Sequence, residues 1–168
     1  MGVTVKWSTK KNSIPAMLKG IKAASGKSIE VGAFNGEHAW LAGIHEYGLD
    51  IEVTPKMRAF LHYQGVHLRP ETTHIHIPER SFLRAGYDEN RKDVLNHAKR
   101  LAAAVAAGRL SADDMFDMLG NELKDMIQDY AEDLDTPGNH PFTIENKGTT
   151  KPLRASGDMI DGINWRIG

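Results

Sequence analysis

Two consecutive amphipathic stretches, residues 88–107 and 111–134, constrain the fold of this chain more than any other part of its sequence. Apolar residues recur at helical spacing in both. The first stripe contains Val94, Leu95, Ala98, Leu101, Ala102 and Val105, and the second contains Met115, Leu119, Leu123, Met126, Ile127, Tyr130 and Leu134. Gly108 can end the first helix, and Ser111 with Asp114 three residues later resembles a capping box. The sequence therefore predicts two long helices joined by a short turn.

Shorter segments around this helical pair carry strand and helix signals. We expect strands at residues 3–7, 28–34, 73–77, 142–145 and 163–167, helices at 13–24 and 38–47, and one or two helical turns between 153 and 160, with Ser13 and Ser156 as caps. In the last strand, Ile163, Trp165 and Ile167 share one face, which indicates a half-buried strand. The predicted fold is α+β, with one mixed or antiparallel sheet covered on one face by two or three helices. A chain of 168 residues suits a single domain, residues 1–168.

Residues 51–76 are interpreted as a projecting β-hairpin arm. Residues 57–63 alternate imperfectly, Gln64-Gly65 is a turn signal, and residues 66–69 return towards the core. A lone hairpin is marginal in water, so its apolar side chains need a partner. The candidate assembly residues of the arm are Met57, Phe60, Leu61 and Val66. The alternative is that the arm folds back and completes its own core, as antiparallel hairpins commonly do.

Arg80 and Arg84 flank Phe82 and Leu83 directly after Pro78, where a predicted strand must stop. Large apolar residues of this kind are usually buried, so we predict that Phe82 and Leu83 are core residues. Arginine is favoured at interfaces because its planar guanidinium forms several hydrogen bonds at once. Arg80 and Arg84 are therefore further candidates for an assembly interface, and the alternative is that both face water.

Charge and composition narrow the classes of function. A formal net charge of -1 argues against a generic nucleic-acid binder, although a salt-sensitive binding module remains a further hypothesis. Lysines dominate residues 6–27 and acids dominate residues 113–135, which suits head-to-tail contacts between copies. An ordinary solvated surface explains this polarity equally well. The chain has no cysteine, and we find no signal peptide or membrane-spanning run, so we expect a cytoplasmic origin and no membrane partner.

The histidines raise the hypothesis of a metal-dependent enzyme. His74 and His76 would share one face of a strand, and His45 adjoins Glu46, so these residues form the candidate ligand set. A zinc site needs three or four converging ligands, and no motif at ligand spacing completes such a set here. We therefore predict no catalytic residue, no metal site and no cofactor. Stoichiometric zinc in protein purified without a metal-affinity tag would favour the enzyme instead.

Several short motifs occur in an order that resembles a known family. The closing motif is Asn139-x-Pro141-x-Thr143-Ile144-x-x-Lys147-Gly148, followed by Pro152-Leu153-x-x-Ser156-Gly157-x-Met159-x-x-x-Ile163. Upstream, in the same order, stand Val31-Gly32, Ala42-x-x-His45-Glu46-Tyr47-Gly48 and Ile77-Pro78-Glu79-Arg80-Ser81-Phe82-Leu83-Arg84. This order resembles the head–tail joining proteins of long-tailed double-stranded DNA phages, also described as tail-completion, neck or virion morphogenesis proteins.

The resemblance implies a structural virion protein without enzymatic activity. Such a protein completes or caps the tail and joins it to the head connector, with the connector and the tail tube or tail terminator proteins as partners. It implies a homo-oligomer, a closed ring of about six copies around a channel for DNA. Contacts with the passing genome would be transient and independent of sequence. The implied location is the head–tail junction of the virion, and the host cytoplasm during assembly.

Overall fold

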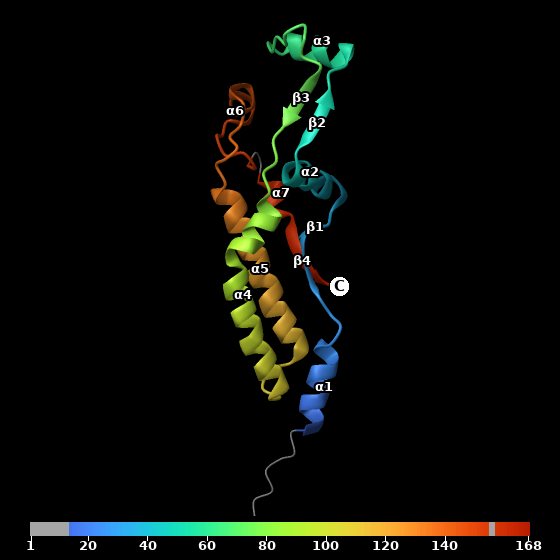
Figure 1. Ribbon diagram of the computed structural model, residues 1–168, viewed down its shortest axis with the longest axis vertical. Helices are drawn as coiled ribbons and strands as arrows, with labels where there is room; N and C mark the ends of the chain where they lie inside the picture. The colour runs from blue at the N-terminus through green and yellow to red at the C-terminus, as the bar shows by residue number, and fades with distance from the viewer. Residues whose placement is uncertain (1–13, 155–156) are drawn as a thin grey trace, which may run out of the picture.

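Helices α4 (Phe82–Ala106) and α5 (Ala112–Asp133) form a helical hairpin that runs along much of the molecule (Figure 1). The turn between them forms as the sequence predicts. Gly108 adopts a positive φ of 68°, and the Ser111 hydroxyl accepts a hydrogen bond from the Asp114 backbone N–H at 3.0 Å. One hydrophobic cluster lies between the helices, formed by Leu101, Val105, Ala112, Met115, Phe116 and Leu119. The two predicted long helices are confirmed.

The structure, a computed structural model, describes residues 14–154 and 157–168. Its other elements are α1 (Ile14–Ala24), β1 (Ile29–Ala33), α2 (Gly36–Tyr47), β2 (Leu49–Glu52), α3 (Pro55–Tyr63), β3 (His74–Ile77), α6 (Pro141–Lys147), α7 (Asp158–Asp161) and β4 (Ile163–Ile167). The predicted strand at residues 3–7 and the predicted caps Ser13 and Ser156 lie outside the described residues. The α+β class is confirmed. The strands form two separate two-stranded sheets, however, instead of the single sheet that we expected.

The first sheet joins the two ends of the described chain. Strand β1 pairs antiparallel with β4, from Ile29 opposite Ile167 to Ala33 opposite Ile163. The Trp165 ring lies directly on α5 at Gly120, where an added Cβ atom would overlap Trp165 Cδ2. The three apolar side chains that were expected to share one face of β4 become more exposed towards the end of the strand. Ile163 is 2% exposed, Trp165 is half-buried and Ile167 is 41% exposed.

A second hydrophobic cluster lies where this sheet meets the helices. Its buried members come from α2, α4, α5, β4 and the segments before and within α7: Ala42, Phe82, Ile127, Ala131, Leu153, Met159, Ile160 and Ile163. Phe82 is completely buried, and Leu83 packs against the cluster as a half-buried neighbour. The prediction that both residues belong to the core is confirmed. Helix α4 therefore begins at this cluster, near the C-terminal end of α2 (Figure 1).

The second sheet forms the shaft of a projecting arm, residues 49–77 (Figure 1). Strand β2 pairs antiparallel with β3, from Leu49 opposite Ile77 to Glu52 opposite His74. The predicted strand at residues 57–63 is wrong, because this segment is helix α3. The Thr54 side chain caps α3 by accepting from the Met57 backbone N–H at 3.2 Å, and Pro55 occupies its first turn. These end signals outweigh the imperfect strand alternation. Residues 66–69, expected as the return strand, form no regular structure.

The predicted strand at residues 142–145 is also wrong, because residues 141–147 form helix α6. Pro141 stands in its first turn, and the His140 side chain accepts from the Phe142 backbone N–H at 3.3 Å. Gly148 follows with a positive φ of 68° and closes the helix by donating to the Ile144 carbonyl at 2.8 Å. Proline at the start and glycine at the end are a helical pattern, and this pattern prevails over the β-branched and aromatic residues between them.

Candidate functional site

The base of the arm is the point where the end of α2, the end of β3 and the start of α4 meet. The Arg80 backbone N–H donates to the His45 carbonyl at 2.6 Å. Gly48 has a positive φ of 72°, and a Cβ atom there would lie 2.9 Å from the Ile77 carbonyl oxygen and 3.0 Å from the Glu79 nitrogen. Only glycine fits this close approach without displacing backbone. The chain therefore leaves α2 and returns from β3 in one fixed arrangement.

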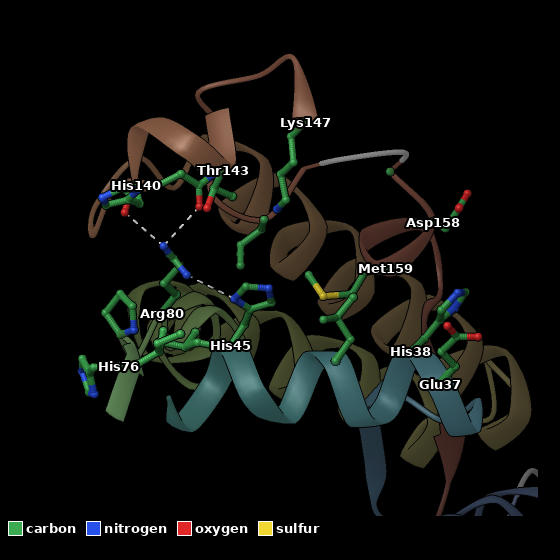
Figure 2. A pocket seen from close by; sticks show the side chains of 18 residues that line it. Glu37, His38, His45, His76, Arg80, His140, Thr143, Lys147, Asp158 and Met159 are labelled. Atoms are coloured by element: carbon green, nitrogen blue, oxygen red, sulfur yellow. Dashed lines mark hydrogen bonds between the residues drawn. The ribbon is translucent and has the colours of Figure 1, made fainter. Parts of the chain in front are cut away.

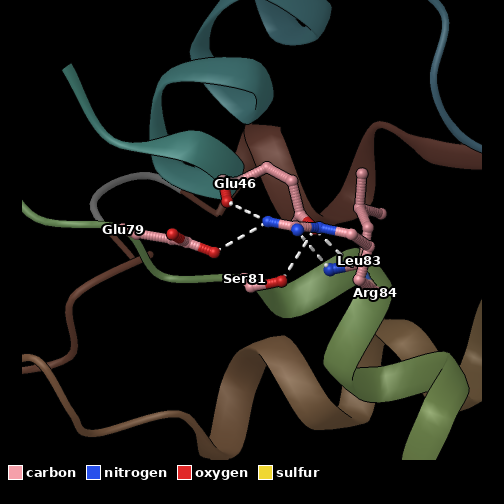
Figure 3. Close-up of polar contacts among 5 residues, drawn as sticks. All are labelled: Glu46, Glu79, Ser81, Leu83 and Arg84. Carbon is pink, nitrogen blue, oxygen red and sulfur yellow. Dashed lines mark hydrogen bonds and ion pairs between the residues drawn. The ribbon is translucent and has the colours of Figure 1, made fainter.

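Glu46 is the centre of the contacts at this base (Figure 3). The residue is 2% exposed, yet its carboxylate accepts four hydrogen bonds. The donors are the Ser81 hydroxyl at 2.9 Å, the Leu83 backbone N–H at 2.8 Å, the Arg84 backbone N–H at 3.1 Å and Arg84 Nε at 2.8 Å. A buried carboxylate is tolerated because each oxygen is satisfied and a cation lies beside it.

This carboxylate caps α4 from another helix. The first backbone N–H groups of any helix lack partners within the helix, and a negative charge is favoured beside them. Ser81, at the cap position of α4, uses its hydroxyl to bind Glu46 and makes no cap hydrogen bond of its own. Helix α4 therefore begins at Phe82. The start at residue 88 that was expected from the sequence is wrong. The acceptor that extends the helix to Phe82 is Glu46, which lies far away in the chain on α2.

Arg84 joins the arm base from α4. Its guanidinium pairs with Glu46 and also with Glu79, through Nη2 at 2.7 Å. The hydrogen bond to Glu46 is the main reason why the pKa of Arg84 is raised above its ordinary value. The guanidinium also lies over the Tyr47 ring, 4.9 Å from its centroid. Its side chain stays 52% exposed, so Arg84 both anchors the base and faces the surface.

Arg80 points to the opposite side, into a cavity beside α6 (Figure 2). The residue is 5% exposed. Its guanidinium donates to the Pro137 carbonyl at 2.8 Å, the Gly138 carbonyl at 3.1 Å and Asn139 Oδ1 at 3.3 Å. Nη1 lies 3.3 Å from His45 Nδ1. Arg80 therefore does not face water, and it holds the loop before α6 against the base of the arm.

The pKa of His45 is shifted by its burial and by the cations beside it. Burial, followed by the positive charges of Arg80 and Lys147, lowers the pKa of His45 from 6.5 to about 4. The imidazole is therefore neutral at pH 7. Since a guanidinium can only donate, Nδ1 is the accepting nitrogen, and the proton of the neutral ring is on Nε2.

This shifted pKa predicts a specific loss of stability in acid. Between about pH 4 and 6.5, His45 binds a proton in the unfolded chain and not in the folded protein. Acidification through this window should therefore lower the free energy of unfolding, by up to about 1 kcal/mol per pH unit after allowance for solvent screening of the half-buried ring. His45→Gln keeps an acceptor for Arg80 but cannot titrate, so its pH dependence should be shallower. Equal slopes in urea unfolding of the two proteins would contradict the assignment.

The four residues of the metal hypothesis have separate partners. Glu46 is used by Arg84 and α4, and His45 contacts Arg80. On the exposed arm, His76 Nδ1 lies 2.7 Å from Asp50 Oδ1, and His74 Nδ1 lies 3.1 Å from the Thr73 hydroxyl. Within residues 14–154 and 157–168, no group of three or more His, Cys, Asp or Glu side chains is placed to hold a metal ion.

The tip of the arm carries the predicted assembly residues. None of residues 49–77 is buried; Phe60 is 58% exposed, while Met57, Leu61 and Val66 are partly exposed. Tyr63, which the sequence analysis did not single out, is the most exposed large apolar residue of the described chain, at 87%. The arm does not fold back onto the core, so this part of the alternative is wrong. Its apolar groups remain available to a partner.

Arg58 holds the tip together and was not identified from the sequence. Its guanidinium donates to the backbone carbonyls of Leu68, Arg69 and Thr72 at 3.3, 2.9 and 2.6 Å. These bonds fix the irregular return segment against α3 in the absence of a core. No sequence motif marks such a role, because the acceptors are backbone groups common to every residue.

Among the described residues, no helix combines the length and the apolar character that crossing a bilayer requires. No protein family, curated protein or solved structure matches this chain.

Proposed function

We propose that this protein is a structural component of the head–tail junction of a long-tailed double-stranded DNA phage. It completes or caps the tail and joins it to the head connector, as a closed ring of about six copies around the DNA channel. The proposed neighbours are the connector and the tail tube or tail terminator proteins. The protein acts in the virion and assembles in the host cytoplasm, and it carries out no reaction.

The observation that carries this proposal is that the motif residues of the resemblance meet in space. Glu46 binds Ser81 and Arg84, Arg80 binds His45 and Asn139, and Gly48 lies against Ile77 and Glu79. Five other motif residues share one hydrophobic cluster: Ala42, Phe82, Leu153, Met159 and Ile163. Motifs that are scattered along the sequence therefore describe one structural unit. Such agreement supports a common fold as the reason for the resemblance.

The shape of the molecule supports a bridging role. Helix α1 lies near one end of the long axis and α3 at the other (Figure 1). Leu18 and Ile21 are exposed on α1, and Phe60 and Tyr63 are exposed on α3. Exposed apolar groups at both ends suit contacts with different neighbours above and below a ring.

Removing the arm tip tests the proposal. Replacing residues 57–69 with a short Gly/Ser linker should leave a soluble subunit that melts cooperatively, because no buried residue is lost. The variant should no longer form rings in electron micrographs, nor restore infectious particles to a phage that lacks the wild-type protein.

A pair of point variants serves as the matched control. Phe60→Gln on α3 should also abolish rings, whereas Met118→Gln on α5, 46% exposed, should preserve them. Normal assembly without the tip, or failure of the tip deletion to fold, would contradict the assigned role of the arm.

A further inference from the structure

A cavity of about 840 Å³ lies between α2, the end of β3, α6 and the segment around α7 (Figure 2). Part of its wall is apolar, from Leu41, Ile75, Ile77, Leu153 and Met159. The remaining wall carries the charged and titratable groups Glu37, His38, His45, His76, Arg80, His140, Lys147 and Asp158. Figure 2 shows Glu37, His38 and Asp158 at the end of the cavity away from Arg80. The cavity is therefore polarised, with Arg80, Lys147 and His45 at one end.

The positive end has no acid to balance it. Lys147 Nζ donates to the Pro152 carbonyl at 3.2 Å, and Arg80 binds carbonyls, an amide oxygen and an imidazole. Neither cation forms a salt bridge with any carboxylate of the described residues. Burial, and then the charge of Arg80, lowers the pKa of Lys147. Two neighbouring cations in a partly buried site raise the free energy of the folded state unless an anion binds between them.

The two cations at this end can only donate hydrogen bonds. An ammonium has three N–H groups, of which Lys147 uses one on Pro152. Arg80 Nη1 has a second N–H besides the one directed at His45. Neutral His45 carries its proton on Nε2, and its hydrogen bond with Arg80 uses the other ring nitrogen, Nδ1. The only acceptor of the Asn139 side chain is already used by Arg80.

We propose that this cavity binds a carboxylate side chain, carried by an apolar segment of a neighbouring protein chain, through Arg80, Lys147 and His45. The carboxylate oxygens accept the free N–H groups, and the flanking apolar residues cover Leu41, Leu153 and Met159. Duplex DNA fits poorly, since its phosphates lie on a stiff rod and Arg80 is recessed inside the cavity. A glutamate or aspartate side chain on a flexible segment can enter the cavity and reach Arg80. The inference does not depend on where in a virion the protein acts.

Binding has a direct signature at His45. A carboxylate next to the ring favours the protonated imidazole, so it should raise the pKa of His45 from about 4. We would titrate His45 by NMR in the full-length protein, alone and with the peptide acetyl-Leu-Glu-Leu-amide. The expected result is a saturable change at His45 and a rise of about one unit or more in its pKa. The matching glutamine peptide should bind at least about tenfold more weakly, because it lacks the charge.

Lysine variants provide the matched control. Lys147→Met keeps the apolar stem and should weaken the glutamate peptide at least about tenfold, whereas Lys147→Arg should retain binding. Lys151→Met, which removes a lysine paired with Asp135 outside the cavity, should have no effect. Equal affinity for the two peptides would overturn the proposal even if a variant fails to fold. Tighter binding of inorganic phosphate or of duplex DNA, or no change at His45, would overturn it as well.

Discussion

Glu46→Ala is expected to lower the free energy of unfolding by about 2–5 kcal/mol, because each part-buried backbone donor left without an acceptor costs about 1–3 kcal/mol. The substitution removes a carboxylate that is 2% exposed and accepts four hydrogen bonds. The N–H groups of Leu83 and Arg84 would then lack a partner at the start of α4. Urea unfolding would measure the loss, and amide hydrogen exchange should accelerate first at these two residues.

Glu79→Ala is the matched control for this prediction. Glu79 pairs with the same guanidinium as Glu46, but its side chain is 54% exposed. Exposed ion pairs contribute little, so Glu79→Ala should change stability by less than about 1 kcal/mol. If the two alanine variants were equally stable, Glu46 would not be the residue that joins α2 to α4.

Deleting residues 163–168 is expected to prevent folding altogether. The deletion removes all of β4, takes away the strand that pairs with β1 among the described residues and opens the cluster around Phe82. Burying one side chain such as Ile163 contributes about 1.5–3 kcal/mol, and the deletion also removes the Trp165 ring from α5. Typical domains are stable by only about 5–15 kcal/mol, so little would remain. The truncated chain should be insoluble, or should lack a cooperative melting transition in circular dichroism.

Point variants in the same strand separate packing from chain length. Ile163→Ala should cost about 2–5 kcal/mol, the usual range for a buried isoleucine. Ile167→Ala, at a position 41% exposed, should cost less than about 1 kcal/mol. Gly120→Val should destabilise by about 1–3 kcal/mol, since the new side chain would displace the Trp165 ring. An unchanged melting curve for Ile163→Ala or for the truncated chain would refute the structural role of β4.

The sequence was sufficient for elements whose signal is long or repeated. The stripes of α4 and α5 extend over several turns, so the helical period is unambiguous there. Ser111 with Asp114, and the alternation from Ile163 to Ile167, are local patterns that the structure reproduces. The secondary structure of two short segments was predicted wrongly. Residues 57–63 and 142–145 contain residues that suit strands, yet proline and a side-chain cap at their starts produced α3 and α6.

The candidate site was predicted only in part. The sequence selected Arg80 and Arg84 as interface candidates and Glu46 only as a possible metal ligand, and the apolar content of the arm selected Phe60. The roles of Arg58 and Lys147 were missed, because their acceptors are backbone carbonyls. The metal hypothesis grouped histidines by their spacing in the sequence, whereas the structure gives His74 and His76 other partners on the arm.

The sequence by itself determined the α+β class, the two long helices and the apolar face of the last strand, because these depend on periodicity within one segment. Only the tertiary structure decided that β4 pairs with β1, that the arm has its own sheet and that Glu46 starts α4 at Phe82. Such contacts join residues far apart in the chain. A carboxylate becomes a helix cap, or an arginine becomes buried, only when folding has removed water and brought its partners within hydrogen-bond distance.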